Sequence, residues 1–233
     1  MTNTEDNPYL TPTEIIDSDH PTVVAYAAEI TNGDLSDPVT VAITLYNRVR
    51  DDILYNPYIA YHREESYQAS NVLMQGKGYC VSKASLLCAL GRACGIPSRV
   101  GFATVRNHIA TKQLIDTMGS NEFVYHGYTQ FLLNGRWVIA TPAFDTETCK
   151  RHRVDPLVFN GIDDSKYQQF NKDKADFMEY IDHHGSYADI PVDTIMAAFR
   201  DKYGNELVQK WIDAFEAMRG IAKRRFSEES VVN

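Results

Sequence analysis

The chain has 233 residues, of which 44% are hydrophobic, and it carries a formal net charge of −8 at pH 7. This length is enough for one domain with a sizeable core and appended segments. The negative charge argues against binding to a nucleic-acid backbone, and no apolar run approaches the roughly 20 residues of a membrane span. We therefore expect neither a nucleic acid nor a membrane as a partner.

Residues 1–30 are expected to form an N-terminal extension. Residues 1–19 are polar and acidic, which differs from a secretory signal. The four cysteines form no C-x-x-C pair, so the sequence predicts neither a zinc site nor a disulfide framework. They are Cys80, Cys88, Cys94 and Cys149. This usage fits a reducing compartment, and we expect a cytoplasmic protein.

A helix is predicted to begin at Asp37-Pro38, where Asp37 caps the first turn, and to continue to about residue 54. Pro57 ends this pattern, and an extended aromatic tract continues to His62. The tract is expected either to line the approach of a substrate or to form a separate hydrophobic cluster. A short helix over residues 66–74 then leads into a Gly-Lys-Gly loop.

Cys80 stands at the entry of the most strongly marked helix of the sequence. Hydrophobic residues recur from residue 81 at three- and four-residue steps, which predicts one buried stripe, and Gly95 and Pro97 end the helix. A thiol in the first turn lies at the positive end of the helix dipole, where a thiolate is favoured. The two preceding glycines would let a substrate backbone approach the sulfur. Cys80 is therefore a candidate nucleophile, and the alternative is a buried, unreactive cysteine.

Two groups near this cysteine are candidate donors for an oxyanion hole. The first is the backbone N–H of Cys80 itself, at the start of the helix. The second is the side-chain amide of Gln75, five residues earlier, for which the alternative is a solvated surface position.

A base for the thiol is predicted on a β-hairpin. Residues 123–133 have strand composition and contain His126, Asn134-Gly135 form a two-residue turn, and residues 136–141 return as the second strand. The return strand can supply a group that orients the imidazole. A strand over residues 98–105 is expected beside this hairpin. The polar segment 106–121, partly helical, is expected to act as a lid or specificity loop, and it contains His108, the rival base.

These residues together resemble the transglutaminase-like superfamily of cysteine proteins. Members carry Gly-x-Cys at a helix entry, Gly-Ile-Pro after the helix, a strand that begins with His, and a Trp-containing return strand that ends in Asp-Pro. The corresponding residues here are Gly78-Tyr79-Cys80, Gly95-Ile96-Pro97, His126 and Trp137 to Pro142. Several motifs occur in the right order over about residues 34–145, which makes the resemblance specific.

The resemblance implies an α+β fold with a papain-like or transglutaminase-like core. In such a core, the helix that bears the nucleophilic cysteine packs on an antiparallel sheet. We expect this core to cover residues 31–160, and residues 161–233 to form a C-terminal helical extension that packs on it.

One position departs from the family pattern. The third catalytic residue is commonly an Asp four positions after the Trp, where this chain has Thr141. A hydroxyl can accept a hydrogen bond from an imidazole N–H, but only a carboxylate stabilises imidazolium by its charge. We predict that Asp145 orients His126, with Thr141 as the alternative third member.

The C-terminal third contains a histidine pair and two predicted helices. A short strand at residues 177–181 is expected to lead into a loop with His183 and His184. Because the pair lacks further ligands at metal spacing, we expect no metal there, and metal binding is one rival function. The helices on either side of Gly204 are expected to pack over the core or to form a face for self-association as a homo-oligomer.

The resemblance implies acyl transfer on amide bonds through a thioester on Cys80, with His126 as the base. We expect hydrolysis of a protein or peptide substrate, as in a protease, deamidase or amidase, while amine transfer, as in a transglutaminase, stays open. No cofactor is expected, and the sequence contains no calcium-binding loop motif.

The rival from another class is a transglutaminase-like binding or scaffolding module without turnover, which Thr141 favours. A strongly depressed pKa of the Cys80 thiol would favour the enzyme, and a pKa near the free value would favour the module.

Overall fold

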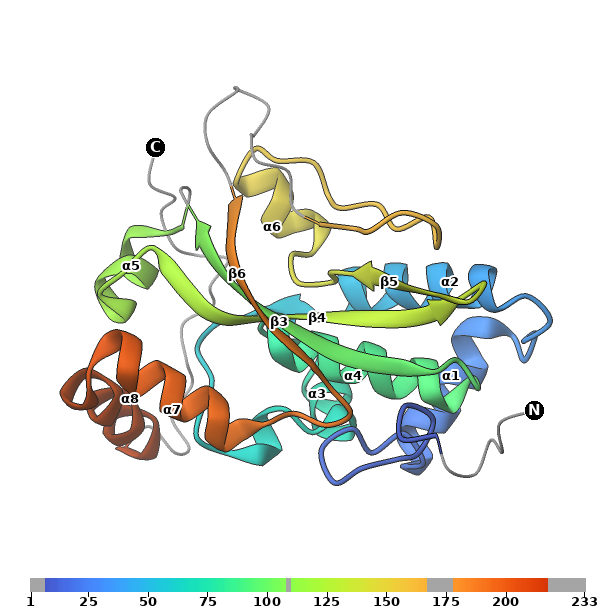
Figure 1. The fold of residues 1–233 in the computed structure, drawn as a ribbon, viewed down its shortest axis with the longest axis horizontal. Helices are drawn as coiled ribbons and strands as arrows, with labels where there is room; N and C mark the ends of the chain where they lie inside the picture. The colour runs from blue at the N-terminus through green and yellow to red at the C-terminus, as the bar shows by residue number, and fades with distance from the viewer. Residues whose placement is uncertain (1–6, 108–109, 167–177, 218–233) are drawn as a thin grey trace.

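A four-stranded antiparallel sheet forms the centre of the computed structural model, which describes residues 7–107, 110–166 and 178–217 (Figure 1). Within these residues the strand order is β5-β4-β3-β6. The strands are β3 (Ser98–Asn107), β4 (Glu122–Leu133), β5 (Arg136–Ala140) and β6 (Met178–Tyr187). The predicted pairing of the strand after Pro97 with the His126 strand is confirmed, because β3 pairs with β4 and sets Ala103 opposite His126.

The hairpin between β4 and β5 has the predicted turn. Asn134 and Gly135 both have positive φ angles, 50° and 78°. A tight turn with two such residues matches the right-handed twist of the strands that it joins. The pairing runs from Leu133 opposite Arg136 to Thr129 opposite Ala140. Beyond that pair, β5 no longer covers the edge of β4.

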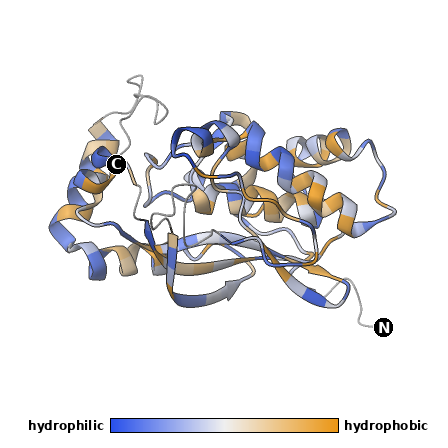
Figure 2. Cartoon of the chain, turned by 90° about the horizontal axis from the view of Figure 1, so that it is seen from above, coloured by the Kyte–Doolittle hydropathy of each residue, from blue (hydrophilic) through white to orange (hydrophobic). Residues whose placement is uncertain are grey.

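The helix that begins at Cys80 lies against this sheet. The helices of this side are α1 (Pro21–Thr31), α2 (Pro38–Asp52), α3 (Ala69–Gln75) and α4 (Cys80–Ala93). Helix α4 packs on β4 and β3, and the other three helices pack on α4. In Figure 2, hydrophobic residues gather in this helical layer beside the sheet.

Helix α4 is buried on all sides, which corrects the prediction of a single buried stripe. Every residue from Cys80 to Arg92 is buried, including Lys83. The reason is the position of the helix, which has the sheet on one side and three helices on the others. The buried small residues Ser82 and Ser85 let these neighbours approach the helix closely.

The remaining elements frame the sheet. They are β1 (Leu54–Tyr55), the 3-10 turn η2 (Glu64–Ser66), β2 (Lys77–Gly78), α5 (Lys112–Met118), α6 (Thr146–Arg151), α7 (Val192–Tyr203) and α8 (Asn205–Ala217). Strands β1 and β2 form a short parallel pair. The predicted break between two C-terminal helices at Gly204 is confirmed. No helix in the described part of the chain is long and apolar enough to span a bilayer.

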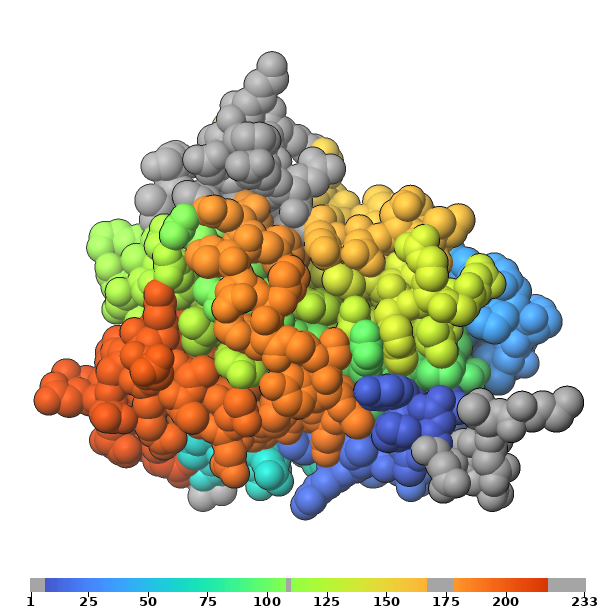
Figure 3. Space-filling model, viewed as in Figure 1, coloured from blue at the N-terminus to red at the C-terminus, as the bar shows by residue number. Residues whose placement is uncertain are grey.

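The histidine pair lies in a strand rather than in the predicted loop. Both His183 and His184 belong to β6, which pairs with the free edge of β3. The ring of His184 stacks on Tyr125 with centroids 4.5 Å apart, and its Nε2 lies 2.8 Å from the hydroxyl oxygen of Thr104. Strand β6 and helices α7 and α8 form much of the face shown in Figure 3.

Candidate active site

Cys80 and His126 line one cavity at the N-terminal end of α4. The volume of the cavity is about 50 Å³. A single water needs about 10–15 Å³, so the cavity can hold a small chemical group and not only one water molecule. The two residues that the sequence pairs as nucleophile and base are therefore brought to the same hollow.

Local backbone geometry fixes Cys80 at the first position of α4. Tyr79 precedes it in extended conformation, with φ −94° and ψ −173°, and the helix begins directly afterwards. Gly78 is required for packing, because a Cβ atom there would lie 2.8 Å from the Cβ of Ser82. This contact corrects the expectation that Gly78 makes room for a substrate backbone.

The start of α4 is in close contact with β4. A Cβ atom on Gly127 would lie 2.9 Å from the Cα of Val81, so the strand and the helix meet backbone to backbone. The N–H groups of Gly127, Val81 and Cys80 act on the Cys80 sulfur and lower the pKa of the thiol. Gly127 directly follows His126 in the chain, so this contact ties the base to the nucleophile.

Burial has the opposite and larger effect on this thiol. The Cys80 side chain is buried, and its desolvation raises the pKa to about 11, above the ordinary value of 9.0. The expectation of a resting thiolate, based on the helix dipole alone, is therefore wrong. Near pH 7 the sulfur carries its proton.

A β-bulge precedes His126. Val105 pairs with Phe123 and Ala103 with His126, so two residues of β4 face one residue of β3. Tyr125 within the bulge has φ 55°, an uncommon value for an aromatic residue. Bulges of this kind redirect side chains and are frequent beside active sites.

Tyr203 of α7 completes the hydrogen bonding of the bulge. The backbone N–H of Val124 donates to the Tyr203 hydroxyl at 3.1 Å, and this hydroxyl donates to the carbonyl of Glu122 at 3.0 Å. A bulge leaves backbone groups outside the ladder, and they need such partners when water is excluded. The C-terminal helices therefore support the strand that carries His126.

The imidazole of His126 is also buried, and desolvation lowers its pKa to about 4 from 6.5. At neutral pH the ring is uncharged. Together with the raised pKa of the thiol, this gives a neutral pair, which an apolar cavity accommodates at lower cost than an ion pair.

Asp145 lies outside the cavity lining and caps α6. Its Oδ1 accepts from the Thr148 N–H at 2.8 Å, and its Oδ2 accepts from the Tyr55 N–H at 2.8 Å and the Thr148 hydroxyl at 3.0 Å. Among the described residues, these are the hydrogen bonds of the carboxylate, and none joins it to His126. Asp145 thus holds in place Tyr55, which lines the cavity.

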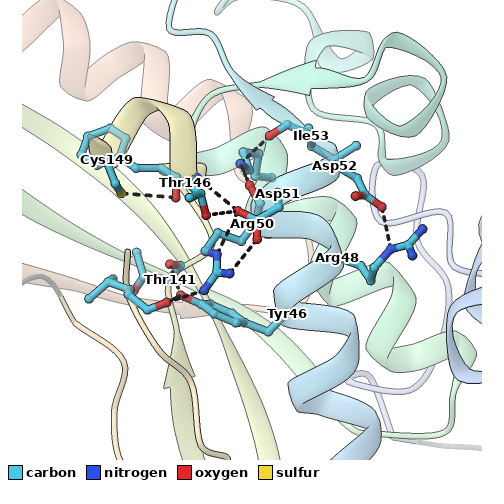
Figure 4. A network of polar contacts seen from close by, with 12 residues as sticks. Tyr46, Arg48, Arg50, Asp51, Asp52, Ile53, Thr141, Thr146 and Cys149 are labelled. Atoms are coloured by element: carbon cyan, nitrogen blue, oxygen red, sulfur yellow. Dashed lines mark hydrogen bonds and ion pairs between the residues drawn. The ribbon is translucent and has the colours of Figure 1, made fainter. Parts of the chain in front are cut away.

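Thr141 is buried directly after β5, and its hydroxyl has no hydrogen-bond partner among the described residues. Its carbonyl accepts from the Tyr46 hydroxyl at 3.2 Å (Figure 4).

Two other residues predicted from the sequence have different outcomes. Gln75 is exposed at the end of α3 and does not line the cavity, so we do not carry it forward as an oxyanion donor. The rival base His108 lies outside the described residues.

Aromatic side chains from distant segments make the walls of the cavity. They include Tyr55, Tyr61, Phe123, Phe199 and Tyr203. The sequence indicated the first two as part of a tract that could line a substrate approach. It gave no sign of the two from α7, because their helical spacing is the same as that of ordinary packing residues.

Lys83, one turn after Cys80, is fully buried, and the sequence pattern did not indicate any role for it. Its Nζ donates to the carbonyls of Arg50 and Ile53, at 2.9 and 2.5 Å, and so caps the C-terminal end of α2. Burial lowers the pKa of this amine to about 7, against the opposing effects of Asp145 and Asp51. The nearby Arg50 and Asp51 side chains pair with each other, and Asp51 accepts from Thr146 of α6 (Figure 4).

Comparison with known proteins finds one matching family and solved structures of low similarity. The model of the transglutaminase-like superfamily matches residues 24–142. No curated protein sequence matches the chain. A solved structure of a candidate cysteine protease from Cytophaga hutchinsonii is 16% identical with a TM-score of 0.46, covering 79% of this chain and 55% of that one. A candidate protease from Parabacteroides distasonis is 14% identical with a TM-score of 0.41, covering 60% and 26%.

The family model covers just over half of the chain, while the chain spans about half the length of the first of these structures. Within the matched range lie the Cys80 helix, the His126 strand and the return strand, in the order and pairing described above. Membership of the family supports a cysteine-dependent enzyme in general. The chain belongs to the transglutaminase-like superfamily.

Proposed function

We propose that this protein is a cysteine hydrolase that cleaves amide bonds of a protein or peptide substrate through a thioester on Cys80. The observation that carries the proposal is that Cys80 and His126 line the same cavity, where α4 and β4 meet backbone to backbone. The uncharged state of both groups defines how the reaction would begin.

In the first step the thiol and the imidazole act together. The Cys80 sulfur attacks the carbonyl carbon while its proton passes to His126, so charge forms only as the bond forms. The carbonyl oxygen becomes an oxyanion that accepts from the backbone N–H of Cys80. His126 then gives the proton to the leaving amine, and the thioester is left on the sulfur.

In the second step water replaces the amine. His126 takes a proton from the water, the resulting hydroxide attacks the thioester carbonyl, and the carboxylic acid leaves with return of the proton to Cys80. An amine in place of water would give acyl transfer instead. We propose water as the acceptor, and a competition experiment decides between the two.

For the third position, the contacts of Asp145 leave Thr141 as the candidate. The Asp145 carboxylate already binds Tyr55 and Thr148, whereas the Thr141 hydroxyl has no hydrogen-bond partner among the described residues. A neutral imidazole needs an acceptor for its N–H more than it needs a nearby charge. Asp145 would then act by positioning Tyr55 and the start of α6.

A binding module without turnover is the second candidate function. The raised pKa of the Cys80 thiol favours it, and so do the contacts of the Asp145 carboxylate, which accepts from Tyr55 and Thr148. It differs from the enzyme in one measurable respect, because an inert thiol forms no thioester with an activated acyl donor.

The test uses 4-nitrophenyl butanoate as the acyl donor, with release of 4-nitrophenolate followed by light absorption and the acylated residue located by peptide mass spectrometry. We expect acylation at Cys80, its loss in Cys80→Ala, and a decrease in rate of about 10²- to 10⁴-fold in His126→Ala at pH 7. Cys94→Ala, which removes a half-buried thiol outside the cavity, is the matched control.

Adding glycine methyl ester then separates hydrolysis from amine transfer. Release of butanoic acid at an unchanged rate supports the hydrolase, and a butanoyl amide as the main product supports a transferase. Absence of any Cys80 acylation would overturn the enzyme and leave the binding module.

A further inference from the structure

The cavity around Cys80 carries no charged side chain in the described part of the chain. No Asp, Glu, Lys or Arg is among its described lining residues. Five tyrosines line it, namely Tyr55, Tyr61, Tyr79, Tyr125 and Tyr203, and burial raises the pKa of each. The walls are therefore uncharged at neutral pH.

Several of these rings pack against other aromatic rings. Tyr61 packs edge to face against Tyr79, Phe199 and Trp211, with centroid separations of 5.4, 5.5 and 6.1 Å. Tyr55, a further lining residue, packs on Phe144 with ring centroids 4.7 Å apart. Rings held in such clusters present a fixed apolar surface to whatever enters.

Part of this surface comes from outside the range of the family model. The model ends at residue 142, whereas Phe144, Met178, Phe199 and Tyr203 all line the cavity. The last two belong to α7. The C-terminal helices therefore add a specific wall to a core that the family shares.

We propose that this cavity selects an apolar acyl group, and that Cys80 accepts acyl groups with aromatic or aliphatic side chains in preference to charged ones. The inference rests on the proposed function, and it names the class of substrate. A charged group entering the cavity would lose its water without meeting an opposite charge among the described lining residues, and this loss is costly. An apolar group gains from leaving water and from contact with the rings.

The experiment compares four 4-nitrophenyl esters that differ in the acyl group. Butanoyl, 4-sulfobutanoyl and 4-(trimethylammonio)butanoyl groups share a four-carbon chain and are uncharged, anionic and cationic, and 3-phenylpropanoyl adds an aromatic ring. In each case the Cys80 S–H bond breaks, a C–S bond forms, and 4-nitrophenolate leaves, with the thiol proton passing through His126 to water. Each rate constant is divided by that of the same ester with N-acetylcysteine, which removes differences in intrinsic reactivity.

We expect 3-phenylpropanoyl transfer to Cys80 to be the fastest, and both charged groups to be at least about tenfold slower than butanoyl. Phe123→Lys then tests the role of the wall. Phe123 is half-buried at the cavity, and a lysine there can keep its ammonium at the rim while its stem covers the wall. The 4-sulfobutanoyl rate should rise about tenfold relative to butanoyl.

Two controls separate the effect of the wall from net charge and from misfolding. Met74→Lys adds the same charge at a residue that is 64% exposed and does not line the cavity, and it should leave the order of the four esters unchanged. Phe123→Leu keeps the site apolar and should retain the wild-type order. Thermal unfolding of each variant shows that it is folded.

The outcomes distinguish this inference from the proposed function. Acylation of Cys80 at equal normalised rates by all four esters, or fastest by a charged one, overturns the apolar preference and leaves the cysteine enzyme standing. Failure of every ester to acylate Cys80 removes the enzyme and the inference together.

Discussion

Gly127 lies directly against Val81, and a Cβ atom on Gly127 would stand 2.9 Å from the Val81 Cα. Because the opposing atom belongs to the backbone, Gly127→Ala must push β4 away from α4. We expect a loss of about 1–3 kcal/mol in the free energy of unfolding, typical of overpacking, and slower acylation of Cys80. Urea denaturation and the 4-nitrophenyl butanoate assay measure the two effects.

The control for this change is Gly135→Asn in the hairpin turn. A Cβ atom at that position meets nothing within 4 Å, and asparagine tolerates the positive φ of 78° better than other residues with side chains. Equal effects of the two substitutions on acylation would contradict the role assigned to the contact between β4 and α4.

His126 is expected to make the fold sensitive to acid. Its pKa is about 4 when folded and 6.5 ordinarily, so between these values the unfolded chain binds more protons and stability falls as pH falls. At about 1.36 kcal/mol per pKa unit, the loss through this window is about 3 kcal/mol. Denaturant unfolding at pH 7, 6, 5 and 4 should show that His126→Gln loses less stability than the wild type.

The exposed His183 provides the comparison for this measurement, because His183→Gln removes a histidine from the surface of β6. If His126→Gln and the wild type lose stability in parallel down to pH 4, the neutral buried imidazole is not the cause of acid sensitivity.

Thr141 and Asp145 are separable by their different effects on stability and rate. Thr141→Val replaces a buried hydroxyl without a described partner by a methyl group, so stability should be unchanged or slightly higher. If this hydroxyl orients His126, the acylation rate should fall about tenfold and its pH profile should shift.

Asp145→Asn should behave in the opposite way. The Asn amide cannot reproduce the acceptor that Tyr55 and Thr148 share, and a loss of about 1–2 kcal/mol is expected with a smaller effect on the rate. A large drop in rate with Asp145→Asn, and none with Thr141→Val, would instead assign the orienting role to Asp145.

Lys83 gives a prediction in the alkaline range. Its pKa is about 7 when folded and 10.5 ordinarily, so above pH 7 the unfolded chain binds more protons and stability rises with pH. The gain between pH 7 and 9 is on the order of 2 kcal/mol. Lys83→Met should lose this rise, and Lys77→Met, which changes an exposed lysine, should keep it. The same slope in all three proteins would exclude Lys83 as its source.

Features set by local sequence signals were predictable. The Asn134-Gly135 turn, the helix that begins at Cys80 and the break at Gly204 each depend on residues next to one another, and each is found where predicted. The pairing of β3 with the His126 strand was also predictable, because strands that follow one another in sequence tend to pair.

Features set by packing were not predictable in the same way. The prediction of one hydrophobic stripe on α4 was wrong because the helix has neighbours on all sides. The sequence does contain a sign of this burial, since Lys83 is the only charged residue from Cys80 to Gly91. The helix-dipole argument likewise ignored burial, which controls the thiol pKa. The positive φ of Tyr125 arises from a β-bulge, and the alternation of apolar and polar residues along a strand does not predict where a bulge occurs.

The hydrogen bond from the Val124 N–H to the Tyr203 hydroxyl joins two segments that are synthesised at different times. During synthesis Cys80 and His126 leave the ribosome well before Tyr203, so the nascent polypeptide carries both chemical groups before the bulge beside the imidazole has its hydroxyl partner. The bulge that precedes His126 therefore cannot reach its final hydrogen bonding until α7 has been synthesised.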